Sequence, residues 1–188
     1  MRRLILSALA VVAVSACDRL APPEPGREGS GSTEAAPAAF DYTATGDLSG
    51  YYLPVADVRA GQWTLSHVFV GQASEFAAWK AGRRSGTFAP VMLQFEDRSS
   101  PLVQTEIGES HTGQLRVLPT RFTVTDDRIR FEGKSAELGA VSFDGRLDQG
   151  ALATARRNLG DDGAVVTGTL RAGGQTASGV RLRWWMGD

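Results

Sequence analysis

The chain has 188 residues, of which 42% are hydrophobic and 22% are charged, and its formal net charge at pH 7 is −1. This length allows one ordinary domain plus a tail, and the composition is globular rather than disordered or coiled-coil. A balance so close to neutral predicts neither a broad basic field for nucleic acid nor an acidic tail. The single cysteine cannot form an internal disulfide, so the fold must rest on a packed core.

Residues 1–16 have the order of a secretory signal peptide. Two arginines precede an apolar run from Leu4 to Val14, which is shorter than the roughly 20 residues that a membrane-spanning helix needs. Small residues close the segment, and the combination is typical of a cleaved signal peptide. The alternative, a buried N-terminal helix, is disfavoured because a tail rich in proline, glycine and serine follows.

The segment ends in the residues VSAC at positions 14–17. This motif resembles the lipobox of bacterial lipoproteins, in which an aliphatic residue and two small residues precede an invariant cysteine. Leucine is usual at the first position, where this chain has Val14. The resemblance implies that the chain is cut before Cys17 and that the thiol of Cys17 carries a diacylglycerol. The protein would then be lipid-anchored in a bacterial cell envelope and face the periplasm.

The residue after the cysteine bears on which membrane holds the anchor. In enteric bacteria an aspartate at the position of Asp18 resembles a signal for retention in the inner membrane, so the motif favours that membrane without deciding the question. Each buried methylene adds about 0.8 kcal/mol and one acyl chain anchors only marginally. Two or three chains on Cys17 would therefore hold the protein almost permanently, and no free thiol would remain for chemistry.

Residues 17–39 are predicted to be the lipidated cysteine and a disordered linker. The stretch is rich in proline, glycine, serine and charge, with almost nothing to bury. A flexible tether of this length spans roughly 25–30 Å. Aromatic residues begin at Phe40, so a single β-domain is predicted over residues 40–188.

Alternation of apolar and polar residues predicts most of this domain to be strands. The pattern occurs over residues 62–71, 89–97, 113–124, 123–133, 140–148 and 164–187. Turns are predicted at Asp126–Asp127 and Gly173–Gly174, and Pro119 indicates an edge or a bend. The large side chains predicted to point inward are Trp63, Phe69, Phe95, Phe131, Phe143 and Trp184.

Two short helices are predicted between the strands. Residues 74–82 have Ser74 as a plausible N-cap, Phe76 and Trp79 on one face, and Gly82 after the last turn. Residues 148–160 have Asp148 as a possible N-cap, and Gly160 ends the segment. The apolar stripe of this second helix is Leu152, Ala155 and Leu159.

The predicted fold is mostly β: an antiparallel meander of about eight strands forming a small barrel or a two-sheet sandwich, with two short helices. Large inward residues favour an interior filled by side chains. A small barrel can instead enclose an apolar ligand, and the pattern alone leaves both possibilities open.

Catalytic and metal-binding candidates are few. The chain contains no G-x-S-x-G elbow, no H-E-x-x-H motif and no P-loop. His67, on the predicted face of Trp63, Leu65 and Phe69, is interpreted as a partly buried, hydrogen-bonded residue, with a general base as the alternative. Glu106, Glu109 and His111 could bind a divalent metal, but their glycine- and serine-containing segment predicts a surface loop. We therefore predict no catalytic residue, metal site or cofactor.

The last predicted strand offers a binding surface. Val180, Leu182, Trp184 and Met186 share one face, and Arg181, Arg183 and Trp185 share the other. An exposed tryptophan beside arginine resembles a contact hot spot and allows cation–π pairing. The alternative is that Trp185 packs under a helix or the N-terminal segment. Adjacent tyrosines, Tyr51 and Tyr52, point to opposite sides, so one of them can lie beside a similar patch.

These features predict a membrane-anchored envelope lipoprotein that acts without catalysis, as a binding or scaffold module for an envelope protein or another envelope component. The alternative is a carrier or sensor of a small apolar ligand in a lipocalin-like barrel, and an envelope hydrolase is a third hypothesis. The predicted partners include the membrane, through Cys17, and exclude nucleic acid.

Overall fold

A computed structural model describes residues 39–105 and 108–187. The predicted signal peptide, Cys17 and almost all of the predicted linker lie outside these residues, so those predictions stay predictions. Neither of the helices described is long and apolar enough to cross a membrane.

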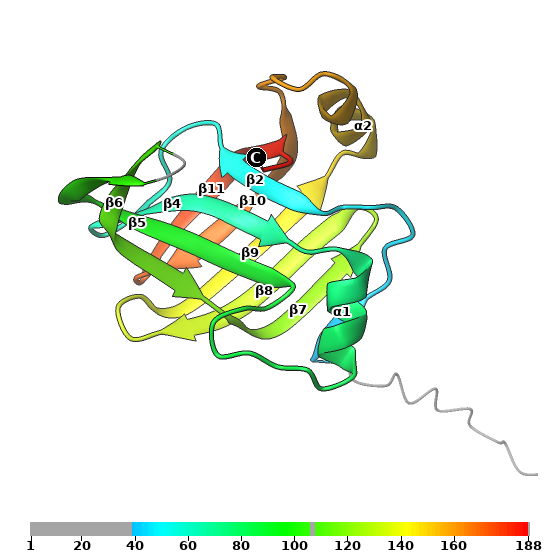
Figure 1. Ribbon diagram of the computed structural model, residues 1–188, viewed down its shortest axis with the longest axis horizontal. Helices are drawn as coiled ribbons and strands as arrows, with labels where there is room; N and C mark the ends of the chain where they lie inside the picture. The colour runs from blue at the N-terminus through cyan, green and yellow to red at the C-terminus, as the bar shows by residue number, and fades with distance from the viewer. Residues whose placement is uncertain (1–38, 106–107, 188) are drawn as a thin grey trace, which may run out of the picture. The chain divides into compact units, whose positions relative to one another are not determined.

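The described residues form one sheet of eleven strands and two helices (Figure 1). The strands are β1 (Phe40–Tyr42), β2 (Gly50–Pro54), β3 (Arg59–Ala60), β4 (Trp63–Val70), β5 (Val91–Thr105), β6 (Gly108–Val117), β7 (Pro119–Thr125), β8 (Arg128–Ser135), β9 (Gly139–Leu147), β10 (Ala164–Ala172) and β11 (Gln175–Trp185). The helices are α1 (Ala73–Lys80) and α2 (Gln149–Arg157). The mostly-β prediction is confirmed, although short strands raise the number above eight.

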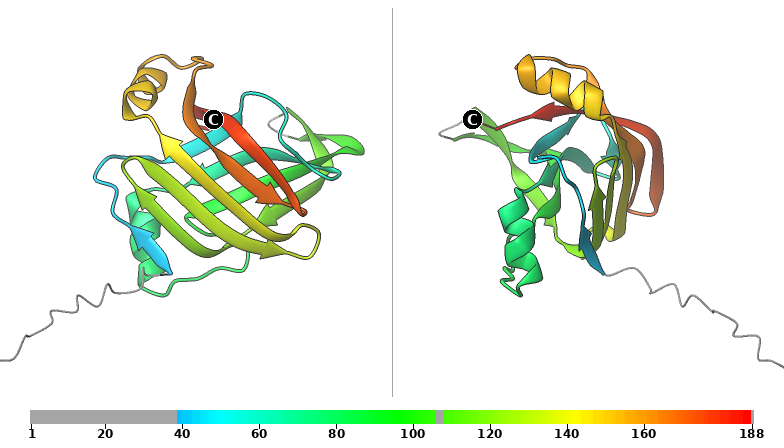
Figure 2. Two further views of the ribbon diagram at one scale, coloured as in Figure 1. Left: turned by 180° about the vertical axis from the view of Figure 1, so that it is seen from behind. Right: turned by 90° about the vertical axis from the view of Figure 1, so that its right-hand side faces the viewer.

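The strand order explains how the sheet curls. The order is β1-β7-β8-β9-β10-β11-β2-β4-β5-β6, with β3 paired to β4 off this path. β7 to β11 form an antiparallel meander, and the antiparallel pairing of β11 with β2 joins it to β4, β5 and β6. The single sheet curls into a half-barrel rather than a two-sheet sandwich (Figure 2). It is mixed rather than purely antiparallel, because β1 pairs with β7 in parallel.

Side chains fill the inside of the curled sheet. The largest fully buried residues are Tyr52, Phe95, Phe131 and Phe143, each at most 1% exposed. Trp184 is also buried, so four of the six large residues predicted to point inward do so, while Trp63 is half-buried. This packing removes the apolar area from water that the fold needs for stability.

A β-bulge corrects the prediction for β4. Leu65 pairs with Phe95, but the next pair on β5 is His67 with Gln94, so Ser66 is an extra residue. An extra residue in one strand reverses the facing of everything beyond it. Leu65 and Val68 are therefore buried, whereas His67 and Phe69 turn to the solvent side. The prediction that His67 and Phe69 share the face of Leu65 is wrong.

Helix α1 covers the side of the sheet where β1 meets β7 (Figure 1). Its N-cap is Gln72, not Ser74 as predicted, and the carboxylate of Glu75 accepts a hydrogen bond from the Gln72 backbone at 2.7 Å. Phe76 and Trp79 are buried as predicted. They pack on the rings of Phe40, Tyr42 and Phe122 at centroid distances of 4.0–5.7 Å.

Helix α2 begins as predicted and ends early. The Asp148 side chain accepts a hydrogen bond from the Ala151 backbone at 2.9 Å, which confirms the N-cap. Leu152 and Ala155 are buried, but Leu159 is 67% exposed because the helix ends at Arg157. The prediction that Leu159 belongs to the buried stripe is therefore wrong.

The predicted turns are confirmed. Asp126–Asp127 connects β7 to β8, and Gly173–Gly174 connects β10 to β11 with φ values of 59° and 71°, which favour glycine. Pro119 is the first residue of β7, and only Leu118 separates it from the end of β6. The segment from Gly108 that was predicted to be a surface loop is strand β6, paired with β5.

Truncation of a core ring tests this arrangement. Phe131→Ala should lower the free energy of unfolding by about 3–5 kcal/mol, because the ring is 1% exposed and leaves a cavity. Urea unfolding followed by circular dichroism measures the change. Trp185→Ala, at a residue that is 38% exposed, is the control and should cost much less. Equal losses for the two variants would contradict the assignment of inner and outer faces.

Candidate functional site

A row of aromatic side chains crosses the solvent side of the sheet. Trp185 on β11 pairs with Tyr51 on β2, and Tyr51 pairs with Phe69 on β4. The Tyr51 ring lies 5.5 Å from that of Trp185, 5.3 Å from that of Phe69 and 5.0 Å from that of His67. Phe88 extends the row, 5.8 Å from Phe69. We call Trp185, Tyr51, His67, Phe69 and Phe88 the aromatic surface.

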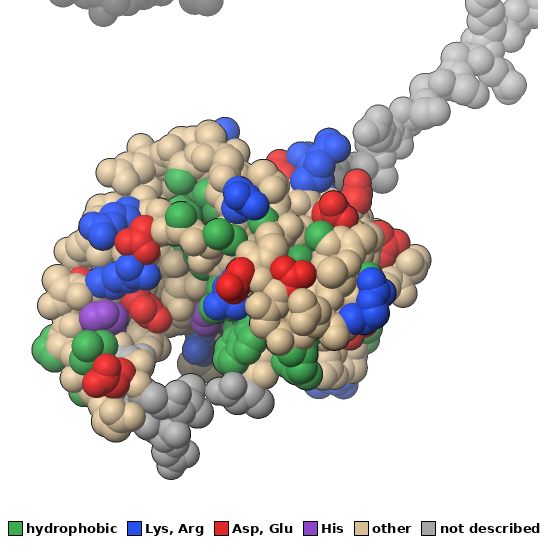
Figure 3. Space-filling view, turned by 90° about the horizontal axis from the view of Figure 1, so that it is seen from above, with side chains coloured by type: hydrophobic (Ala, Val, Ile, Leu, Met, Phe, Trp, Pro, Cys, Tyr) green, Lys and Arg blue, Asp and Glu red, His purple; other side chains and the backbone are tan. Residues whose placement is uncertain are grey.

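A polar hollow of about 320 Å³ adjoins the aromatic surface. Figure 3 shows a hollow with a histidine at its wall and hydrophobic side chains beside it. Its floor includes Gln94, which donates to the side chain of Gln114 at 3.3 Å and accepts from Arg116 at 3.2 Å. Rings beside amide and guanidinium groups can contact a partner by apolar area and by hydrogen bonds together.

His67 lies between the rings and the hollow, and it is partly buried as predicted. Its Nδ1 is 3.2 Å from the hydroxyl of Ser66. Burial, together with the positive charge of Arg116, lowers the pKa of His67 to about 4. The imidazole is therefore neutral near pH 7 and contributes to the surface as a ring with a hydrogen-bonding edge.

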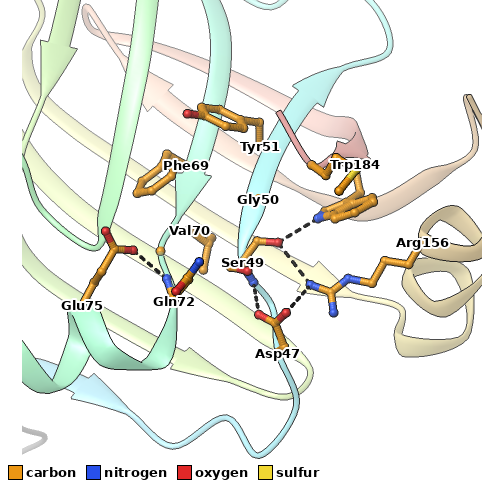
Figure 4. Close-up of a pocket in the computed structure, with 12 residues that line it drawn as sticks. Asp47, Ser49, Gly50, Tyr51, Phe69, Val70, Gln72, Glu75, Arg156 and Trp184 are labelled. Carbon is orange, nitrogen blue, oxygen red and sulfur yellow. Dashed lines mark hydrogen bonds and ion pairs between the residues drawn. The ribbon is translucent and has the colours of Figure 1, made fainter. Parts of the chain in front are cut away.

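A second, larger cleft opens next to Tyr51 and Phe69 and holds about 510 Å³ (Figure 4). Its polar side is a small network around the carbonyl oxygen of Ser49. Trp184 Nε1 donates to this oxygen at 3.0 Å, and Arg156 donates to it at 3.1 Å. Arg156 also pairs with Asp47 at 3.3 Å, and its guanidinium lies 5.1 Å from the Trp184 ring centre. The network connects α2 to the start of β2 and the end of β11.

Gly50 makes this network possible. Its φ is +139°, a conformation that other residues rarely adopt. A Cβ at this position would lie 2.3 Å from Trp184 Nε1. The absence of a side chain therefore lets the indole reach the carbonyl of Ser49, and it fixes the wall of the cleft.

The cleft is charged on both sides. Burial opposes ionisation of Asp47, but hydrogen bonds from Ser49 and the charge of Arg156 hold its pKa below the ordinary value. Glu75, at the start of α1, brings a second carboxylate to the lining. Arg156 Nε is buried and has no partner among the described residues. Aromatic walls and groups of both charges suit a binding cleft for a polar ligand or side chain.

The three residues predicted for binding share the outer face of β11, as expected, but they have different neighbours. Trp185 is 38% exposed and packs on Tyr51. Arg181 is exposed, whereas Arg183 is partly buried and lies 3.6 Å from Asp162. Among the described side chains, the guanidinium stacked on a tryptophan of β11 is Arg156 on Trp184, not Arg181 or Arg183 on Trp185.

Only part of the possible metal site lies within the described residues. Glu106 lies outside the described residues, and His111 Nδ1 is 2.9 Å from the carbonyl oxygen of Ser100. Over residues 39–105 and 108–187, no group of three histidine, cysteine or acidic side chains could hold a metal ion.

Several site residues were missed from the sequence. Phe69 was assigned to the core because the bulge at Ser66 carries no signal in the alternation. Arg156 lies within the second predicted helix, and nothing local in the sequence connects it to Trp184 or Asp47. A Gly–Tyr–Tyr run at 50–52 was the one usable signal, because it marks a close backbone approach followed by one ring on each face.

Comparison with known proteins adds no relative: no family model, curated protein or solved structure matches the chain. Function must therefore be argued from the site itself.

The pKa of His67 predicts how stability depends on pH. The unfolded chain takes up this proton near pH 6.5 but the folded protein only near pH 4, so the unfolded state binds more protons between these values. The stability is fully present above pH 6.5 and falls by at most about 3 kcal/mol as the pH drops to 4. Urea unfolding at pH 7, 6, 5 and 4 measures it. His67→Gln should flatten the dependence over this window, and identical curves would refute the assignment.

Proposed function

We propose that the chain is a membrane-anchored envelope lipoprotein whose domain from Phe40 onward is a non-catalytic binding module. The module binds an envelope protein, or another envelope component, through the aromatic surface and the cleft beside it. The anchor is Cys17, as the VSAC motif implies.

One observation carries the binding role: rings from β11, β2 and β4 stand in register on the solvent side of the sheet. Such rings, only partly exposed and rimmed by polar groups, offer large contact area at low entropic cost. Tyrosine, tryptophan and arginine are the residues that most often dominate binding energy at interfaces. Trp185, Tyr51 and Arg116 bring all three types to this face.

The lining of the cleft supports binding rather than catalysis. It contains Asp47, Glu75, Arg156 and Ser49 but no histidine, cysteine or lysine that could activate a nucleophile. Both Asp47 and Arg156 are engaged in the network around Ser49. Groups held in this way orient a bound molecule better than they transfer protons.

The alternative function, carriage of a small apolar ligand, is favoured by a different place in the fold. The interior of the half-barrel is filled, but a pocket of about 240 Å³ lies between α1, β1 and β7. Its lining includes the rings of Phe40, Tyr42, Phe76, Trp79 and Phe122. Trp79 Nε1 is buried there without a partner among the described residues. A small aromatic molecule would suit the rings of this pocket.

The anchor is tested by Cys17→Ala in the bacterial host. The substitution removes the proposed lipid attachment point, so the protein should leave the membrane fraction or retain its unprocessed signal segment. Cell fractionation and intact mass spectrometry measure both outcomes. Ser15→Ala, which keeps a small residue before the cysteine, is the control and should remain lipidated. An unchanged mass and membrane association in Cys17→Ala would exclude the anchor.

The binding surface is tested by a pull-down of the lipidated protein from membranes. Tyr51→Ser with Trp185→Ser should reduce recovery of a specific partner by about tenfold, because two partly exposed rings are removed from the contact. Leu159→Ser, at a residue that is 67% exposed and not part of the aromatic surface, is the control. Quantitative mass spectrometry compares the three proteins. Partners recovered equally with all of them would contradict the role of the aromatic surface.

Recovery of a small molecule instead of a protein would support the alternative function. Native mass spectrometry of the purified protein shows such a ligand directly. Phe76→Leu should then release the ligand, whereas the change at Tyr51 and Trp185 should not.

A further inference from the structure

A row of arginines crosses the outer face of the sheet over β8, β9 and β11, and it shares β11 with the aromatic surface. Arg128 on β8 pairs with Arg146 on β9, Arg146 pairs with Thr167 on β10, and Thr167 pairs with Arg181 on β11. Three arginines and a threonine therefore stand side by side across four strands, a span of about 14 Å at the usual strand spacing. This face of the meander is the one toward the viewer in the left view of Figure 2. We call Arg128, Arg146 and Arg181 the arginine row.

The whole face is strongly positive, although the chain is nearly neutral. Strands β7 to β11 contain no acidic residue other than Glu132 and Asp144. Their basic residues are Arg121, Arg128, Arg130, Lys134, Arg146, Arg171, Arg181 and Arg183. The net charge of −1 for the full chain does not predict this basic face. Strand pairing brings basic residues from distant parts of the sequence to the same face.

Four of these eight basic residues, Arg121, Arg128, Arg130 and Arg183, form ion pairs, the last of them with Asp162. Asp144 binds Arg128 with two hydrogen bonds of 2.8 and 2.7 Å and lies 3.4 Å from Arg130. Glu132 pairs loosely with Arg121 at 3.9 Å. Arg146, Arg171 and Arg181 are exposed, and no ion pair or hydrogen bond connects their side chains to another described residue. The face therefore keeps several guanidinium groups available.

The row places two arginines directly opposite each other, Arg128 and Arg146. Like charges in such a pair repel, and here Asp144 offsets the charge of Arg128 but not that of Arg146. Arginine is also the residue whose planar fork of donors matches phosphate best. Arg128, Arg146 and Arg171 line a groove of about 390 Å³, together with Asp144 and the hydroxyls of Thr167 and Thr169. Asp144 is held by Arg128, so Arg146, Arg171 and the hydroxyls remain as groups that can bind phosphate.

We propose that the arginine row docks the domain on an anionic phospholipid surface. Charge complementarity favours an anionic partner. Trp185, at the end of β11, is the one outward aromatic side chain on β7 to β11, so these strands offer no series of rings on which nucleic-acid bases could stack. The inference rests on the proposed function in one respect, because a tether of roughly 25–30 Å from a lipidated Cys17 keeps the domain within reach of a bilayer. The other strand residues of the aromatic surface lie on β2 and β4, beyond β11 in the strand order, so docking of the row leaves most of that surface open to a partner.

Co-sedimentation with vesicles tests the proposal. The full chain carrying Cys17→Ala is used, so that no acyl chain contributes, and vesicles of phosphatidylcholine are compared with vesicles that also contain phosphatidylglycerol. The apolar residues 4–14 are common to every sample, so the readout is the difference in binding between the two compositions. Binding should be stronger to the anionic vesicles and should fall steeply with salt.

Arg146→Gln with Arg181→Gln should weaken this anionic preference by about tenfold or more, since each basic residue near the surface contributes on the order of 1 kcal/mol. Arg83→Gln with Arg157→Gln is the matched control, because it removes the same charge from exposed positions outside β7 to β11. Circular dichroism confirms that both variants are folded.

Three outcomes would overturn the proposal: equal binding to both vesicle types, equal loss in both double variants, or arginine-dependent binding to duplex DNA in place of vesicles. Each is independent of the fractionation of Cys17→Ala in cells. A failed anchor and a failed docking face are therefore distinguishable.

Discussion

The pairing of β2 with β11 is the constraint on which the rest of the structure depends. It joins residues far apart in the chain, and the bond from Trp184 to Ser49 next to it spans 135 positions. Without this pairing, the meander of β7 to β11 and the strands β4 to β6 would be two small sheets with their apolar faces open to water. The junction is close-packed because Gly50 leaves room for the Trp184 indole, and Arg156 closes it from α2.

In the joined and curled sheet, the inner faces of the strands form the core and the outer faces form the contact surfaces. The inner side packs rings such as Tyr52, Phe131 and Phe143 into a core with little exposure. The outer side is divided across the sheet, with rings over β11, β2 and β4 and arginines over β8, β9 and β11. Strand β11 contributes to both, through Trp185 and Arg181. A domain of this kind can hold two different contacts at once without any moving part, which fits the proposed binding module.

The parts of the fold that could be predicted are those fixed by neighbours in sequence. Alternation in β8 and β9 placed Phe131 and Phe143 correctly, and turn residues placed both hairpins, because these features depend on local backbone geometry. Prediction was wrong where one residue changes the register, as Ser66 does in β4, and where a helix ends before its pattern does, as at Leu159. For the binding site, the sequence predicted only Trp185, Arg181 and Arg183. Tyr51, which packs on Trp185, comes from a strand distant in sequence.

The sequence by itself determined most of the longer strands, the two helices, the inner side of most of these strands and a cysteine motif typical of a lipid anchor, because each depends on the order of adjacent residues. It did not predict β2, whose pairing with β11 joins the sheet. The tertiary structure alone decided that the interior is filled, that Tyr51 meets Trp185 and Phe69, and that Arg128, Arg146 and Arg181 stand in one row. The physical reason is that strand pairing sets which outward side chains become neighbours. No local pattern encodes a register between segments so far apart in the chain.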